Sequence, residues 1–286
     1  FILQVLKRLC KNKLALAGGI VVLLFLIVGC LAPVIAPHDP LEVNVSIRLQ
    51  GPSQEYWLGT DHLGRCILSR LIYGAQTTLL NSLVVLAVIL LIGIPLGLIS
   101  GFCGGWIDNL IMRFADIVST FPSSLLALAV VSVFGAGLQN VMIVLVALWW
   151  APFARILRSQ VLKIKEKDFV MAAKASGTSK FKIVINHVLL NFISPIIVYS
   201  TLRVAAVIMH IASFSFIGLG TQPPAADWGV MLSDSKQFIS TAPLMMIWPG
   251  LSIMLVVFSL NMFGEGLNEA LMPGGNKKAK QLGDGE

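Results

Sequence analysis

The sequence predicts an all-α integral membrane protein with about six transmembrane helices, and three observations support this. Of its 286 residues, 56% are hydrophobic and 12% are charged, with a mean hydropathy of +0.85; an ordinary soluble domain carries about 25% charged residues. Apolar runs of about 20 residues, enough to cross a bilayer as a helix, recur along the chain. Lys and Arg gather in a few segments. Such a chain is not a soluble enzyme, a disordered tail or a collagen-like protein.

Apolar segments that end at Pro, Gly or polar residues are the predicted spans. The first is retained rather than removed as a signal peptide, because it is longer than a signal core and lacks a small-residue cleavage site. Pro122 is predicted to kink the third. The predicted spans are residues 14–36, 77–100, 108–137, 138–153, 192–218 and 243–264. The other divisions are an N-terminal segment (1–13), a loop (37–75), a membrane core (76–270) that includes the loop 155–191, and a tail (271–286).

Lys and Arg set the orientation, because they mark the cytoplasmic side of a membrane protein. The N-terminal segment carries four, the loop after the fourth span carries eight and the tail carries three. The loop after the fifth span carries Lys236 alone, and loop 37–75 carries three that are diluted by four acids. Both termini and loop 155–191 are therefore predicted to be cytoplasmic, and loops 37–75 and 219–242 extracytoplasmic.

The cytoplasmic stretch from Asp168 to Asn191 carries the most informative pattern. Small residues precede Gly177, a natural helix stop, and a second short amphipathic segment begins at Thr178. Two short helices joined at a glycine form a compact knob, and its small side chains let the groove of another protein approach closely. The alternative is an ordinary solvated basic loop.

This stretch resembles the EAA coupling motif of ABC importer membrane subunits, in the form found in the peptide/nickel permease family. Two positions depart from the family pattern: Met171 stands where many members have Glu, and Leu190 where they have Pro. Without that acid, the resemblance does not imply a salt bridge to the ATPase at this position, whereas docking by shape is unaffected. By this resemblance the ATPase contacts are Ala172, Ala173, Lys174, Gly177, His187 and Asn191.

Residues 57–71, 105–122 and 215–229 resemble further segments of the same family, in the same order. The resemblance implies a type I ABC importer permease fold in the cytoplasmic membrane of a bacterium or archaeon. It also implies a second, different permease chain, two ATPase subunits and an extracytoplasmic substrate-binding protein. The chain itself would bind no cofactor and catalyse no reaction, since ATP and magnesium act in the ATPase subunits.

Two other classes of function remain as alternatives. The first, ranked below an ABC importer subunit, is an ATP-independent channel or secondary carrier, which would move solute without an ATPase. An intramembrane enzyme would need paired acids or a Ser/His set within the spans, and Asp116 is the only acid well inside one.

The extracytoplasmic segment 58–64 has the composition of a turn, with two glycines around Thr-Asp. Asp61, His62 and Arg65 either contact the binding protein or brace the loop, and turn residues usually serve the turn.

Arg203 and His210 both lie inside the fifth predicted span. They are seven residues apart, so they share one helix face to within about 20°. Ionisable groups within a span usually face a cavity or a partner, so these two are predicted to line the translocation path together with Asp116. The alternatives are that Arg203 pairs with an acid on another helix, such as Asp116, or extends to the membrane surface.

The substrate expectation follows from the same two residues. A fixed cation at Arg203 repels a bare divalent metal but suits a carboxylate. Residues 209–216 resemble the nickel and metal-chelate branch of the family, where a His occupies the place of His210. Nickel or a metal chelate is therefore the expected substrate, with di- and oligopeptides as the alternative. No metal site is fixed, and His210 is the candidate ligand.

Overall fold

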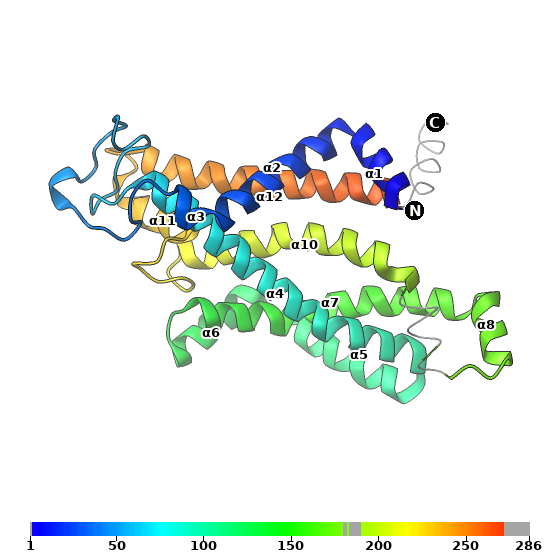
Figure 1. Ribbon diagram of the computed structural model, residues 1–286. Helices are drawn as coiled ribbons and strands as arrows, with labels where there is room; N and C mark the ends of the chain where they lie inside the picture. Colours follow the sequence, from blue (N-terminus) through cyan, green and yellow to red (C-terminus); the bar gives the residue numbers. More distant parts are fainter. Residues whose placement is uncertain (1, 180–181, 183–189, 272–286) are drawn as a thin grey trace, which may run out of the picture.

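The computed structural model describes residues 2–179, 182 and 190–271, and this part of the chain is almost entirely helical. The long helices run roughly side by side between two ends (Figure 1). One end holds α1, α8 and the end of α12, and the other holds α11 and the loop before α4. The helices are α1 (Ile2–Lys11), α2 (Lys13–Cys30), α3 (Ala32–Ile35), α4 (Ile67–Cys103), α5 (Gly105–Ser119), α6 (Ser123–Phe134), α7 (Leu138–Lys165), α8 (Asp168–Ala175), α10 (Leu190–Phe216), α11 (Trp228–Ser235) and α12 (Leu244–Leu271), with 3₁₀ turns at Val45–Ile47 and Lys236–Phe238.

Five helices, α2, α4, α7, α10 and α12, are long and apolar enough to cross a membrane. The pair α5 and α6 makes a sixth crossing if it is counted as one span, bent by 79° at its break. The bend falls at Pro122, where the backbone is extended, as the sequence predicts. The prediction of an all-α fold with about six spans is confirmed. The first and last helices meet at one end, where the Arg8 side chain donates to the carbonyl of Ala270 over 3.4 Å.

Three helices extend well beyond their predicted spans, and one of them, α12, continues to Leu271 instead of ending near residue 264. The helix α4 begins at Ile67 rather than near Thr77, so its first part lies in what was predicted to be loop 37–75. The helix α7 continues through the basic stretch to Lys165 instead of ending near Phe153. Hydropathy marks where a helix leaves the hydrocarbon, and a helix continues beyond that point wherever its polar side chains find partners.

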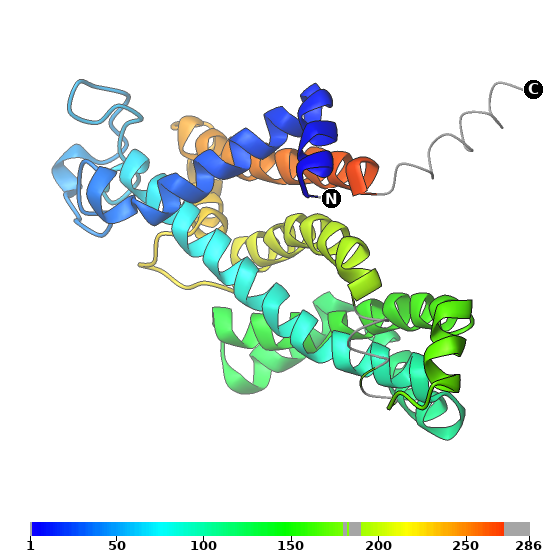
Figure 2. The same ribbon diagram turned by 45° about the vertical axis from the view of Figure 1, so that its right-hand side comes forward.

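The helices α4 and α7 form the most extensive helix–helix contact in the described part of the chain. Gly93, Gly97 and Gly101 form a stripe along α4 at the spacing that lets two membrane helices approach closely. A Cβ atom on Gly97 would lie 2.8 Å from the carbonyl oxygen of Ala154 and 2.9 Å from the Cβ of Leu157. The stripe therefore sets how α7 lies against α4. Figure 2 shows α4 crossing from the α2 and α12 side to the α7 side of the molecule.

Gly97→Val tests this packing. The added methyl groups meet backbone and side-chain atoms of α7, so we expect a loss of about 1–3 kcal/mol of stability, the usual cost of overpacking. A thermal melt of the detergent-purified chain measures it. The control is Gly51→Val, because a Cβ on Gly51 meets nothing within 4 Å. Equal melting temperatures for the two variants would contradict the close-packing account.

Candidate functional site

The cytoplasmic elbow, residues 168–179, consists of the short helix α8 and the turn at Gly177. The turn closes α8 through two backbone hydrogen bonds, from Ser176 N to Ala172 O (3.0 Å) and from Thr178 N to Ala173 O (3.1 Å). Gly177 lies in the left-handed region with φ +76°, which favours glycine. The chain therefore turns sharply at the position predicted from the sequence.

The outer surface of the elbow is made of small, exposed residues. Ala172, Ala175 and Gly177 are exposed, and a Cβ on Gly177 would meet nothing within 4 Å. Nothing in the described part of the chain covers this surface. His187 lies outside the described residues, and Lys174 and Asn191 are placed only by their backbone, so three predicted ATPase contacts have no described side chain.

One buried side chain fastens the elbow to the membrane helices. Val170 of α8 is fully buried and packs in the core cluster that contains Ile164 at the end of α7 and Phe192 in the first turn of α10. The backbone amide of Lys167 also donates to the carbonyl of Ile164 over 3.0 Å. The elbow is therefore anchored in the same core cluster as the end of α7 and the start of α10.

The extracytoplasmic end is held by a buried ionic network. Arg65 Nε donates to Asp61 Oδ2 at 2.6 Å, and Arg65 Nη2 reaches Asp234 Oδ2 at 3.2 Å. Arg70 lies 3.7 Å from Asp61 and donates to the carbonyl of Pro224 over 3.3 Å. Asp61 and Arg65 are 5% and 1% exposed. In this geometry they brace the loop before α4 against the region of α11, and the partly exposed His62 stacks on Phe238.

The start of α11 is anchored to α4 by neighbouring residues. The Asp227 carboxylate caps α11 by accepting from the amide of Gly229 at 2.9 Å, and burial raises the pKa of that carboxyl. The indole of Trp228, fully buried, donates to the carbonyl of Leu71 over 3.0 Å. A Cβ on Gly74 would lie 2.5 Å from the Trp228 ring. The extracytoplasmic loops thus form one braced cap on α4.

Arg203 and His210 share a face of α10, as their spacing predicts, and both meet Trp149 of α7. The Arg203 guanidinium lies 4.7 Å from the centroid of the Tyr199 ring and 5.6 Å from that of Trp149. The His210 ring meets the edge of Trp149 with centroids 4.8 Å apart. Both side chains are partly exposed. His210 also borders an open cavity of about 290 Å³ between α10 and α12, with Met209 and Asn261 on its wall.

Asp116 does not join Arg203. Its carboxylate pairs instead with Arg155 of α7 at 2.8 Å, and both side chains are about half exposed. The predicted trio is therefore split, with Arg203 and His210 on α10 and Asp116 on α5. Among the described residues, no acid lies within ion-pair distance of Arg203.

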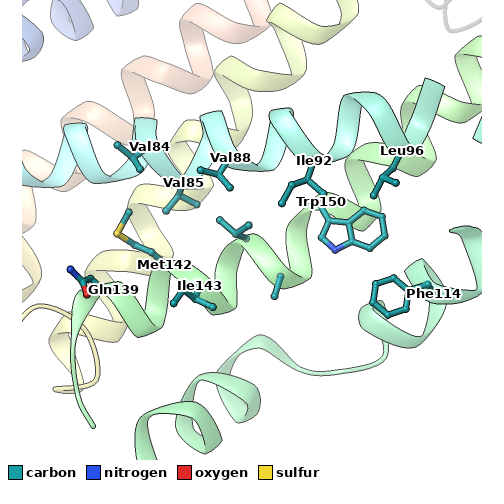
Figure 3. Close-up of a pocket in the computed structure, with 12 residues that line it drawn as sticks. Val84, Val85, Val88, Ile92, Leu96, Phe114, Gln139, Met142, Ile143 and Trp150 are labelled. Atoms are coloured by element: carbon teal, nitrogen blue, oxygen red, sulfur yellow. The ribbon is translucent and has the colours of Figure 1, made fainter. Parts of the chain in front are cut away.

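A larger open groove of about 670 Å³ lies between α4, α5 and α7, and its wall is almost wholly apolar (Figure 3). Phe114 and Trp150 stack at its end near Leu96, with ring centroids 5.8 Å apart. Gln139 is the polar residue on this wall, at the opposite end. This surface offers no charge to a polar solute, so the face of α10 is the better candidate for the translocation path.

Three features were not identified from the sequence. The glycine stripe of α4 has a visible signal, glycine at every fourth residue. The position of Trp149 between Arg203 and His210 was not predicted, because contacts between two separate helices leave no local pattern. The ion pair of Asp108 and Arg158 had no signal, because nothing in the spacing of two separate helices shows which charges meet.

Comparison with known proteins gives consistent family matches. Residues 93–274 match the family model described as binding-protein-dependent transport system inner membrane component. Residues 1–52 match the N-terminal TM domain of oligopeptide transport permease C. The solved structure of the MetNI methionine ABC transporter, in inward-facing conformations, matches with a TM-score of 0.56 at 19% identity, covering 71% of this chain and 96% of that chain. This last likeness shows the fold.

Three curated relatives carry different substrate names. The chain is 45% identical over 270 residues to the dipeptide transport system permease protein DppC of Alkalihalophilus pseudofirmus, covering 94% of this chain and 89% of the relative. It is 39% identical over 237 residues to the nickel transport system permease protein NikC of Escherichia coli, covering 83% and 86%. It is 38% identical over 269 residues to the glutathione transport system permease protein GsiD of Pectobacterium atrosepticum, covering 93% and 89%.

These matches extend over nearly the whole chain and agree with its helical architecture. The chain therefore belongs to the family of binding-protein-dependent transport system inner membrane components, and it is a non-catalytic, multi-span permease subunit of an ABC importer of the bacterial inner membrane.

Proposed function

We propose that this permease forms, with a second and different permease chain, the translocation path for a small solute that carries a carboxylate, of the short-peptide class. Arg203 is the observation that carries the proposal. It is a permanently charged group in a membrane helix, partly exposed, and no acid of the described chain neutralises it. A carboxylate on the passing solute would supply the missing partner.

The surroundings of Arg203 suit a transient partner better than a permanent one. Tyr199 and Trp149 hold the guanidinium by their ring faces, which orients the cation without neutralising it. A guanidinium presents its donors in a planar fork that matches a carboxylate. The dipeptide and glutathione permeases among the relatives are named for solutes that carry carboxylates.

Nickel, free or in an anionic chelator, is the second candidate, and His210 is the observation that favours it. Its imidazole and the thioether of Met209 border the same cavity, and both groups can bind a transition metal. Two such groups do not complete a metal site, and Arg203 lies on the same helix face. A chelate with its own carboxylates therefore suits the face better than the bare ion.

The elbow is proposed to bind the ATPase partner. Its exposed small residues, Ala172 and Gly177 among them, would enter a groove of a cytoplasmic ATPase subunit, where ATP and magnesium act. Val170 would pass the movement of that subunit to α7 and α10. On the opposite side the braced cap would receive the substrate-binding protein. Asp61 and Arg65 hold that cap in shape, and His62 is its candidate contact.

The substrate proposal is tested by uptake in cells that lack their own peptide and nickel importers and express this importer with its partner subunits. We expect a labelled dipeptide to accumulate. Arg203→Gln should lower uptake by roughly tenfold or more, since a hydrogen bond to a charged group contributes about 1.5–3 kcal/mol. Arg203→Lys should retain part of the uptake. Arg113→Gln, at an exposed arginine of the membrane helix α5, is the control.

The competing solutes give distinct outcomes in the same assay. Uptake of a nickel chelate without uptake of the dipeptide would favour the second candidate. Uptake of free nickel, unaffected by Arg203→Gln, would contradict the carboxylate proposal altogether.

The elbow proposal predicts that Gly177→Val separates ATP hydrolysis from uptake. Valine disfavours the left-handed backbone and adds bulk to the docking surface, but it meets nothing within the chain, so assembly should persist. Gly177→Asn, which tolerates this backbone, should keep more uptake. The matched control is Gly135→Val, which has φ +88° and equal open space at the extracytoplasmic end of α6. Normal uptake per ATP hydrolysed in Gly177→Val would refute the docking.

A further inference from the structure

The cytoplasmic ends of α4, α5 and α7 meet at a single carboxylate. Asp108, in the first turn of α5, accepts two hydrogen bonds from the Arg158 guanidinium, with Oδ1 to Nε and Oδ2 to Nη2 both at 2.5 Å. The hydroxyl of Ser100, in the last turn of α4, donates to the same carboxylate. Close by, the Lys165 ammonium donates to the carbonyl of Gly101 over 3.2 Å. We refer to Ser100, Asp108 and Arg158 as the clamp.

The helix that this clamp holds is otherwise loosely attached. At one end α5 begins after Gly104 and at Gly105, which both lie in the left-handed region (φ +67° and +57°). At the other end it stops at the 79° break before α6. Its packing onto α7 is centred on Ala115, which is fully buried against Trp150 and its neighbours. A helix with flexible connections at both ends and its packing centred on one residue can tilt, so a further contact is needed to fix the direction of α5.

Within the described part of the chain, the opposite surface of α5 is largely uncovered: Trp106 is 75%, Leu110 55% and Ile117 59% exposed, while Phe114 stacks on Trp150 of α7. The second ion pair to α7, from Asp116 to Arg155, lies at the surface with both side chains about half exposed. Such pairs fix geometry weakly. The clamp is therefore the strongest polar contact that holds α5 in line with α7.

The form of the clamp suits orientation better than stability. The Asp108 side chain is 11% exposed and that of Arg158 is 30% exposed, so the pair is largely removed from water. Such a pair contributes little net stability, because desolvation offsets the attraction. A two-point guanidinium–carboxylate contact, however, fixes both distance and angle between its helices.

Arg158 also lies on the route from the elbow. The helix α7 is continuous from Arg158 to Lys165, and α8 begins at Asp168 after a short turn whose amides bond back to the end of α7. A displacement of α8 would therefore also displace Arg158. Through the clamp, the same movement reaches α5 and the end of α4.

We propose that the clamp is a positioning device of the transport cycle: Arg158 and Asp108 lock α5 to α7, so that a displacement of the elbow by the ATPase moves α5 together with α7. The proposal rests on the proposed docking of the elbow. It assigns to Asp108 and Arg158 a role in transmitting movement, without contact with solute or nucleotide.

Asp108→Asn tests the clamp, because it keeps the shape of the side chain and removes its charge. The first measurement is independent of the substrate: the distance between spin labels at Leu110→Cys on α5 and Lys163→Cys on α7, in the assembled importer. Exposed native cysteines Cys10, Cys30 and Cys103 are replaced by serine. With Asp108 in place, we expect the same narrow distribution in the nucleotide-free and ATP–vanadate-trapped states. In Asp108→Asn, the distribution should shift or broaden on trapping.

The second measurement is uptake of a labelled dipeptide per ATP hydrolysed in proteoliposomes with all partner subunits. We expect Asp108→Asn to lower this ratio by on the order of tenfold, within the usual range of coupling between sites, with ATP hydrolysis retained. The double variant Asp108→Arg/Arg158→Asp should recover most of the ratio. Arg113→Gln, at an exposed cation of α5, should leave it unchanged.

The outcomes separate the clamp from the proposed function. An unchanged label distance and an unchanged ratio in Asp108→Asn would overturn the clamp and leave the elbow docking intact. If Asp108→Asn does not assemble, the charge-reversed pair decides: assembly without recovered distance or ratio overturns the clamp. If trapping moves no label in any variant and Gly177→Val behaves as wild type, the elbow docking fails instead.

Discussion

Mechanical coupling between the cytoplasmic surface and the membrane helices depends on the close contact between α4 and α7. Because Gly93, Gly97 and Gly101 present no side chains, the backbone of α7 lies directly against α4. The helix α7 then continues unbroken into the cytoplasm, where α8 begins. A wider or softer contact would let α7 slide past α4 when α8 is displaced. With this contact, a displacement of α8 at the cytoplasmic surface would move α7 and α4 together at the membrane depth where Trp149 and Arg203 lie.

Charge is used differently at the two ends and in the middle of the molecule. At the extracytoplasmic end, Arg65 and Arg70 are buried with Asp61 and Asp234, which fastens the loops to α4. At the cytoplasmic end, charge fixes the direction of α5. Between them, on the face of α10, Arg203 is held by aromatic rings instead of a carboxylate, which leaves its charge available. Satisfied ion pairs thus shape the frame, and we assign the unpaired cation of α10, Arg203, to the solute.

Sequence reasoning predicted the features that depend on short-range pattern. Hydropathy identified the membrane class and about six spans, proline chemistry placed the break at Pro122, and the helical period placed Arg203 and His210 on one face. The small-residue run before Gly177 predicted the elbow turn. Sequence reasoning did not predict the full lengths of α4 and α7. Outside the hydrocarbon, a helix is stabilised by contacts with its partners, and hydropathy does not report these contacts. Sequence reasoning also missed the partners of Asp108 and Asp116, because pairing across helices depends on packing that no local pattern shows.

The central claim is that the elbow lies in a groove of the ATPase subunit, and site-specific photo-crosslinking tests it most directly. A benzophenone side chain at Ala175, an exposed position of α8, is irradiated in native membranes that contain the whole importer. The same group at Leu41, exposed in the extracytoplasmic loop, is the reference. The account predicts an adduct between Ala175 and the ATPase subunit, and none from Leu41. An elbow that forms no adduct with the ATPase, or that a membrane-impermeant reagent reaches from outside intact cells, would contradict it.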